Sequence, residues 1–263
     1  MEHEQQQQVS VERLTRDLSK AATTLSIDEV RFLVDAYYQM QKNRIRSVHQ
    51  TRTLAEANEP HTLLTWLAMQ SETLESQIKR ALDKYGASQP LGEWAREVVG
   101  IGPVITAGLL AHIDLEKAPT SGHIWRFAGL DPTSKWERGK KRLHNASLKR
   151  LCWLIGESFV KVKGHEADIY GKVYEQRKTF EHQKNDRGEY AEQAAAVLKA
   201  RPAHAQKAIY ATGKLPDGHI HARAKRYAVK LFLAHYHEAG LRLTGRPIPL
   251  PYPIAHLGHV HKR

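Results

Sequence analysis

The sequence contains very little cysteine: Cys152 is the only one among 263 residues. A single cysteine excludes an intramolecular disulfide framework and a cysteine-rich zinc site. Because Cys152 lies in the apolar run LCWLIG, we expect it to be a small buried hydrophobe. The sequence also lacks an apolar run near the ~18 residues that a membrane span needs, and MEHEQQQQ at its start lacks the pattern of a secretion signal. We therefore expect a cytoplasmic protein with no membrane partner.

Acidic residues are in the minority, with 28 Asp and Glu against 40 Lys and Arg, for a formal net charge of +12. This imbalance and a pI of about 9.7 favour polyanions as partners. Simple solubility is the alternative interpretation of the charge. The 41% of hydrophobic residues is enough to build a core.

The first part of the chain has the pattern of two long helices. Ser26 and Glu29 form a capping-box pattern, and apolar residues recur from there at helical spacing until about Pro60. A second apolar stripe covers 63–85, and Gly86 is typical of a helix end. We predict an antiparallel helical hairpin or one arm of a coiled coil, through which the chain forms a homodimer or a higher oligomer.

A tight turn with two glycines interrupts VVGIGPVITAGLLAHI. Gly100 and Gly102 allow positive φ and leave the backbone amides bare, and Pro103 occupies the favoured first position of a helix. The N-terminus of a helix offers unpaired N–H groups and a partial positive charge, so this turn can hold a phosphate. With the short helix LGEWAREVV before it, the layout is that of a helix-hairpin-helix unit, which grips a nucleic-acid backbone without reading sequence. An ordinary glycine-capped turn is the alternative. The predicted binding residues of the turn are Gly100, Ile101, Gly102 and Pro103.

The next helix is expected to begin at Thr120 or Ser121, and a basic connector follows it. Five cations, two glycines and one tryptophan lie within 129–142, a composition that suits an arm that neutralises phosphates and stacks on a base. An ordinary surface loop is again the alternative. Ser147 is expected to cap the apolar helix that follows. The predicted binding residues here are Lys135, Trp136, Arg138, Lys140, Lys141, Arg142, Lys149 and Arg150.

The C-terminal part carries fewer signals. Residues 189–212 are helical in propensity with a break at Arg201-Pro202, and 219–240 form an amphipathic helix. We expect Tyr227 on the core face of this helix and Arg223 and Arg226 outside, where they either extend a nucleic-acid surface or are simply solvated. The histidines His256, His259 and His261, like the pair His235 and His237, lack the spacing of a zinc site, so we expect no metal and no cofactor.

These patterns predict an all-α protein in three parts. A helical hairpin or coiled-coil arm covers 1–88, a compact helical domain that contains the helix-hairpin-helix unit covers 89–245, and a proline-rich tail covers 246–263.

Three motifs in order, GIGPVITAGLLAHI, HIWRFAGLDP and RGKKRLHNASLKRLCWLI, resemble the C-terminal domain of the DEDD transposases of the insertion-sequence one-ten group. The resemblance covers about 91–159, and the helical arm is similar in kind to the coiled coil of that family. It implies a mobile element, DNA transposition and recombination, DNA and a structured RNA as partners, and a place in the bacterial cytoplasm or nucleoid.

The sequence departs from that family in two respects. The family has an N-terminal nuclease-like domain with four metal-binding carboxylates, whereas no apolar strand with an aspartate precedes the helical arm, so we expect this domain to be absent here or supplied by a separate protein. The family's nucleophilic serine would lie where this sequence has Glu137, in the segment Glu137-Arg138-Gly139-Lys140. A carboxylate does not replace that serine, because the chemistry needs a hydroxyl that joins to phosphate. Ser134 and Ser147 lie nearby, and we expect neither to be the nucleophile.

We therefore expect a transposase-like binding protein that holds DNA without catalysis of its own. The alternative is an active transposase or recombinase that uses a displaced serine or a carboxylate domain supplied in trans. A purely structural coiled-coil adaptor, in which the positive charge is incidental, is a third interpretation.

Overall fold

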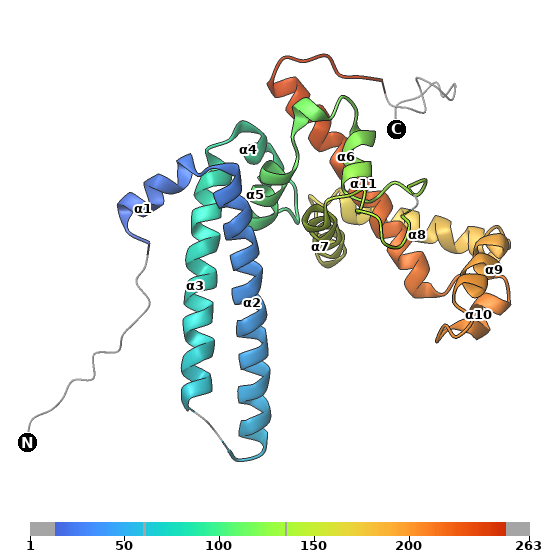
Figure 1. The fold of residues 1–263 in the computed structure, drawn as a ribbon, viewed down its shortest axis with the longest axis horizontal. Coiled ribbons are helices and arrows are strands. Elements are labelled where there is room, and N and C mark those ends of the chain that lie inside the picture. The colour runs from blue at the N-terminus through green and yellow to red at the C-terminus, as the bar shows by residue number, and fades with distance from the viewer. Residues whose placement is uncertain (1–13, 60–61, 135, 251–263) are drawn as a thin grey trace, which may run out of the picture. The chain divides into compact units, whose positions relative to one another are not determined.

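The structure is a computed structural model that describes residues 14–59, 62–134 and 136–250. Within these ranges the chain consists of helices and loops, with no strand, so the predicted all-α class is confirmed (Figure 1). No helix in this part of the chain is both long and apolar enough to cross a membrane. The described residues form two compact units, one within 14–93 with 102–112 and the other within 94–101 with 113–250.

The first unit is built on two long antiparallel helices, α2 (Ile27–Glu56) and α3 (Thr62–Ala87) (Figure 1). The short helices α1 (Arg16–Ala21) and η1 (Ala22–Thr24) precede them. The predicted capping box at the start of α2 is confirmed: the Ser26 hydroxyl accepts from the Glu29 amide, and the Glu29 carboxylate accepts from the Ser26 amide over 2.7 Å. The hydrogen bond from the Ser26 amide to this carboxylate is the main cause of the lowered pKa of Glu29. Helix α4 (Pro90–Arg96) begins in this unit and ends in the other.

Helix α5 (Pro103–His112) packs against both long helices of the first unit. Its buried side chains join those of α2 and α3 in one core, and the Arg31 guanidinium of α2 donates to the Ala111 carbonyl oxygen over 2.9 Å. Six of the ten residues of α5 are buried, because the helix has almost no polar face. The predicted boundary at residue 88 therefore differs from the observed units, since α5 belongs with the long helices. The core residues are Val30, Val34, Leu82, Tyr85, Val104, Ala107 and Ala111.

Farther from this core, the seam between α2 and α3 is polar. Ser47, Ser71 and Glu75 are buried, and the Arg44 guanidinium pairs with the Glu75 carboxylate at 2.6 Å. The apolar stripe expected over 63–85 includes Leu63, Trp66, Leu67 and Leu74, and these side chains are 39–59% exposed. The buried line of α3 instead continues from Leu82 through the partly buried Ile78 to Glu75 and Ser71, so its outer part is polar.

The second unit is organised around α11 (Asp217–Leu243), which confirms the predicted long C-terminal helix. Helices α6 (Ser121–Phe127), α7 (Ala146–Val162) and α8 (Tyr170–Asp186) pack against it. Phe232 of α11 lies among the rings of Trp94, Phe159 and Tyr170, with centroids 5.3–6.3 Å away. The remaining elements are η2 (Leu115–Lys117), α9 (Ala191–Ala200) and α10 (Lys207–Ala211), and the break between α9 and α10 matches the predicted one at Arg201-Pro202.

Because α6, α7 and α8 all pack against α11, its residues do not divide simply into a buried apolar face and an exposed basic face. Ala228 and Phe232 are buried as expected, whereas Tyr227, expected in the core, is 37% exposed. Arg223 is half-buried rather than outside, whereas Arg226 is exposed.

Candidate nucleic-acid interface

The turn between α4 and α5 has a conformation that needs one of its two glycines. Gly100 has φ +94°, as predicted, and a Cβ there would lie 3.1 Å from Cγ2 of Val162. The Ser158 hydroxyl donates to the Gly100 carbonyl oxygen over 2.6 Å, and the Ile101 amide donates to the Val98 carbonyl oxygen over 2.9 Å. Gly102 does not have positive φ, so of the two glycines only Gly100 uses the conformation that glycine allows.

Gly102 instead leaves open space at the start of α5. A Cβ built on Gly102 would meet nothing within 4 Å, and the Gly102 carbonyl oxygen accepts from the Thr106 amide over 3.0 Å as the first bond of the helix. Pro103 is the first residue of α5, as predicted. The first amides of any helix lack partners within it, so the chemistry predicted for this turn is compatible with its backbone.

The basic connector is a loop whose two ends are joined. The Asn145 amide donates to the Phe127 carbonyl oxygen over 2.8 Å. Gly129 has φ +67°, and a Cβ there would lie 2.9 Å from the His144 ring and 3.2 Å from Cδ of Lys149. Because α6 and α7 fix these ends, the loop is anchored at its base.

Hydrogen bonds also order the interior of the loop. The Asp131 carboxylate accepts from the Thr133 hydroxyl at 2.7 Å, the Thr133 amide at 2.9 Å and the Ser134 hydroxyl at 3.3 Å. The hydrogen bonds from Thr133 are the main reason that the pKa of Asp131 is lowered. The Trp136 indole N–H donates to the Lys140 carbonyl oxygen over 2.8 Å, while its side chain stays 51% exposed. The predicted site residue Lys135 lies outside the described residues.

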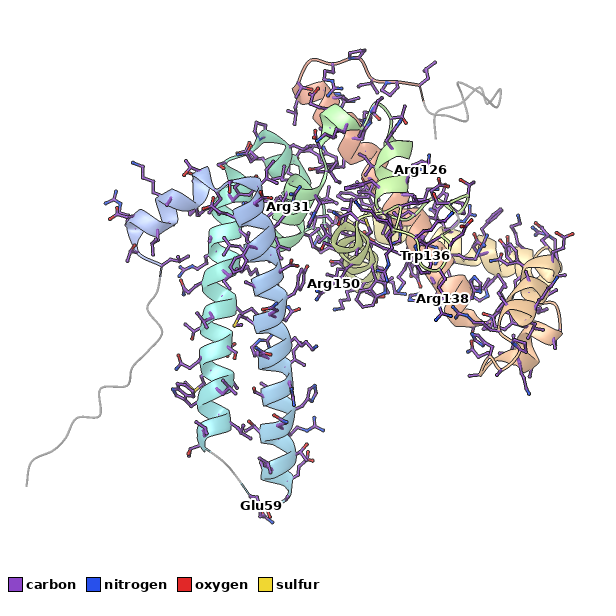
Figure 2. The ribbon with its side chains drawn as sticks, viewed as in Figure 1. Arg31, Glu59, Arg126, Trp136, Arg138 and Arg150 are labelled. Carbon is purple, nitrogen blue, oxygen red and sulfur yellow. The ribbon has the colours of Figure 1, made fainter. Side chains whose placement is uncertain are left out.

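The cations of the loop differ in how they are paired. Lys140 forms an ion pair with Glu137 at 2.8 Å. Arg138, Lys141 and Arg142 are exposed, and no carboxylate in the described ranges lies within ion-pair distance of them. Figure 2 shows Trp136 and Arg138 on this loop. Three cations without carboxylate partners therefore face solvent on an anchored loop.

Helix α7 adds charge directly after the loop. Lys149 and Arg150 are exposed in its first turns, with Arg150 labelled in Figure 2. The helix is capped by Asn145, whose side chain accepts from the Leu148 amide over 2.9 Å. The prediction that Ser147 is the cap was wrong, because Asn145 is an equally good capping residue two positions earlier.

Two surface residues in this region were missed by the sequence analysis. Trp153 is 59% exposed, one turn after Lys149, and the Lys225 ammonium lies 5.8 Å from its ring centroid. Arg126, at the end of α6, is also exposed. Trp153 lies in the apolar run around Cys152, so composition alone did not suggest that it is exposed. The helical spacing of Leu148, Cys152 and Ile155, however, places residue 153 off the buried face.

Arg223 takes part in a network of ion pairs and hydrogen bonds inside the second unit. It pairs with the buried Glu181 carboxylate at 2.6 Å and donates to the Gln193 side chain over 3.0 Å, and Glu181 also pairs with Arg177 at 2.6 Å. Burial raises the pKa of Glu181, but hydrogen bonds from Arg223, Tyr190 and Arg177 outweigh it and leave the pKa lowered. Arg223 therefore stabilises the packing of the second unit, whereas the side chain of Arg226 is exposed.

The serine candidates have little that would activate them. The described hydrogen-bond partner of the Ser134 hydroxyl is Asp131, whose lowered pKa makes it a poor general base near neutral pH. Ser147 is exposed in the first turn of α7. Burial raises the pKa of the Cys152 thiol to about 12, which disfavours the thiolate form that a nucleophilic cysteine needs.

The described residues contain no group of three or more His, Cys, Asp or Glu side chains placed to bind a metal ion. The tail histidines His256, His259 and His261 lie outside the described residues.

The fold and this surface define the class of the chain as an all-α protein of two units, one of which carries an anchored basic loop with exposed tryptophans nearby. Comparison with protein-family models, with curated proteins and with solved structures finds no significant match. The resemblance to DEDD transposases therefore rests on the three sequence motifs.

Proposed function

We propose that this chain is a transposase-like nucleic-acid-binding protein that grips the phosphate backbone. The observation that carries the proposal is the exposure of Arg138, Lys141 and Arg142, without carboxylate partners in the described ranges, on a loop anchored at its base. Such cations bind phosphates and release condensed counterions, which supplies affinity that does not depend on sequence. A loop that is already ordered loses less conformational entropy when it binds.

Exposed aromatic side chains near these cations extend the proposal to nucleotide bases. Trp136 lies within the loop, and Trp153 lies on α7 after Lys149 and Arg150. Base stacking on aromatic rings tolerates any sequence, because every base has a π-face. DNA is the proposed partner, with a structured RNA as the second, and the α2–α3 arm is the proposed site of self-association.

The turn at Gly100 to Pro103 is the second proposed backbone contact. The open space at Gly102 allows a phosphate oxygen to approach the amides at the start of α5. Gly100 serves the shape of the turn, since its φ of +94° and the Ser158 hydrogen bond hold the backbone in place.

We propose binding without strand exchange by this chain alone, because Glu137 stands at the serine position of the family and pairs with Lys140. An active recombinase, assembled with a separate carboxylate-domain protein, is the alternative. Incubation with DNA followed by a denaturing gel distinguishes them: an adduct that disappears in Ser134→Ala or Ser147→Ala establishes the recombinase, and no adduct is expected for the binding protein.

The direct test of the proposed interface is charge reversal of the loop. The triple variant R138E/K141E/R142E is compared with K199E/R201E/K207E, which reverses three exposed cations of 199–207 in the same unit and changes the net charge equally. Fluorescence anisotropy with a random-sequence duplex measures both. Loss of binding in the loop variant alone supports the proposal, and equal loss in both variants contradicts a localised interface.

A further inference from the structure

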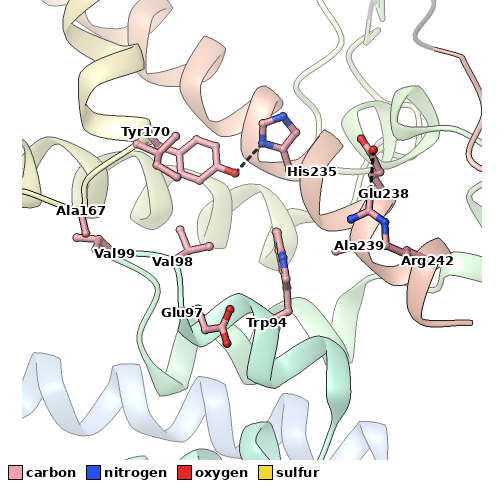
Figure 3. A pocket seen from close by; sticks show the side chains of 11 residues that line it. Trp94, Glu97, Val98, Val99, Ala167, Tyr170, His235, Glu238, Ala239 and Arg242 are labelled. Atoms are coloured by element: carbon pink, nitrogen blue, oxygen red, sulfur yellow. Dashed lines mark hydrogen bonds and ion pairs between the residues drawn. The ribbon is translucent and has the colours of Figure 1, made fainter. Parts of the chain in front are cut away.

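A pocket of about 590 Å³ lies within the second unit (Figure 3). It is lined by α11, by the end of α4 and the segment after it, and by the start of α8 with the residues just before it. This volume falls within the range of ~300 to ~1,000 Å³ that is usual for small-molecule sites. None of the cations proposed to bind nucleic acid lines it. The pocket is therefore separate from the proposed nucleic-acid interface, and a ligand bound in it would contact other residues.

The walls of the pocket combine aromatic and aliphatic surface. Trp94 is backed by Phe232, with parallel rings 6.3 Å apart, and Tyr170 is fixed by a 2.8 Å hydrogen bond to Nδ1 of His235. Val98, Val99 and Ile169 supply aliphatic surface, and Ile169 is 60% exposed. The rigid rings and exposed aliphatic groups suit a ligand with a hydrocarbon portion.

The charge of the pocket is opposite to that of the whole chain. Two carboxylates, Glu97 and Glu238, and one guanidinium, Arg242, line it, so its net charge is −1 with His235 neutral, while the chain carries +12. Arg242 pairs with Glu238 at 3.1 Å, and Glu97 is exposed. A phosphate or carboxylate ligand is disfavoured by this charge, whereas a cation gains attraction from Glu97 and from the ring of Trp94, which also lines the pocket.

From this combination we infer that the pocket binds an alkylammonium group, with the ammonium near Glu97 and the alkyl chain against Val98, Val99 and Ile169. The group belongs either to a free amine, such as a polyamine, or to a lysine side chain of another protein. The inference does not rest on the proposed function, because nucleic-acid binding uses other residues and a ligand of opposite charge.

Calorimetric titration of the full chain with n-pentylamine tests the inference, with n-pentanol as the uncharged control of similar shape. We expect a dissociation constant of about 1 mM or tighter for so small a ligand, and at least about tenfold weaker binding of the alcohol, equivalent to one charge-assisted contact. Spermidine and Nα-acetyl-lysine methylamide separate the two sources: tighter binding of spermidine supports a free amine, and tighter binding of the lysine derivative supports a lysine side chain.

Variants locate the binding. Glu97→Gln is expected to weaken n-pentylamine binding about tenfold, whereas Arg242→Gln, which makes the pocket more negative, is expected to tighten it. Glu166→Gln is the matched control, because Glu166 is an exposed carboxylate beside the pocket residue Ala167 but does not line the pocket. Equal binding of amine and alcohol, or no difference between Glu97→Gln and Glu166→Gln, overturns the inference.

Discussion

The Ser158 hydroxyl of α7 donates a 2.6 Å hydrogen bond to the carbonyl oxygen of Gly100, so α7 holds the backbone of the turn before α5. Both residues belong to the second unit, and α7 also follows the basic loop directly in sequence. One helix thus anchors one end of the loop and supports one residue of the turn.

Gly100 and Gly102 are expected to respond differently to substitution. Gly100→Ala should destabilise the fold by about 1–3 kcal/mol, because residue 100 has φ +94° and its Cβ would crowd Val162 and Phe159. Gly102→Ala should cost at most about 1 kcal/mol, because its Cβ meets nothing within 4 Å. Thermal and urea unfolding of the two variants measure the difference. Equal losses of unfolding free energy would mean that Gly100 is not needed for the conformation of the turn.

Gly102→Val separates binding from folding at the turn. It is expected to weaken duplex binding more than Lys141→Ala does, since a branched side chain blocks the approach of a phosphate to the backbone, whereas one cation is one contact among several. Anisotropy titrations give both affinities, and urea unfolding shows whether the variant is folded. A folded Gly102→Val variant with wild-type affinity means that the turn is merely structural.

Removal of the Ser158 hydroxyl should weaken the support of the turn. Ser158→Ala is expected to cost about 1 kcal/mol of unfolding free energy, the usual net contribution of one hydrogen bond. Ser158→Thr keeps the hydroxyl and is the control. If the alanine variant is as stable as the wild type, the hydrogen bond to Gly100 does not contribute to folding.

The Glu181 network should make stability depend on pH. The pKa of Glu181 is lower in the folded chain than its ordinary value, so its ionised form stabilises the fold above about pH 5 and this contribution is lost as the pH falls through the folded-state pKa. The stability difference between wild type and Glu181→Gln is therefore expected to be largest near neutral pH and to shrink in acid. Urea unfolding at several pH values measures it, and a constant difference contradicts the prediction.

Arg223 and Arg226 are expected to contribute differently to the stability of the fold. Arg223→Ala leaves the buried Glu181 carboxylate with fewer partners and should cost about 3 kcal/mol of stability. Arg226→Ala should change stability by less than about 0.5 kcal/mol, as is usual for surface positions. Thermal unfolding distinguishes them, and similar melting temperatures for both variants would show that the network around Glu181 contributes little.

Local sequence patterns predicted much of the helical structure. The Ser26–Glu29 capping box, Pro103 at the first position of α5 and the break at Arg201-Pro202 depend on neighbouring residues alone, and all three are observed. The polar seam at Ser71 and Glu75 and the grouping of α5 with the long helices depend on packing between distant segments, which apolar spacing does not encode.

In the candidate site, too, some features could be predicted from the local sequence and others depend on packing between distant segments. The exposed loop cations could be predicted from composition, because a run of Lys and Arg has few ways to be buried. The ion pair between Glu181 and Arg223 and the exposure of Trp153 both depend on which helices surround α11 and α7. The local pattern suggested the opposite in each case: an amphipathic pattern placed Arg223 outside, and an apolar run placed Trp153 among buried residues.

The salt dependence of duplex binding is the most direct test of phosphate contact by the basic loop. Three cations on the loop, each in contact with one phosphate, predict that the dissociation constant of a random-sequence duplex rises about 40-fold between about 50 and about 200 mM salt, and that R138E/K141E/R142E removes this dependence. A dissociation constant that stays unchanged over this range would mean that the loop cations do not bind phosphates.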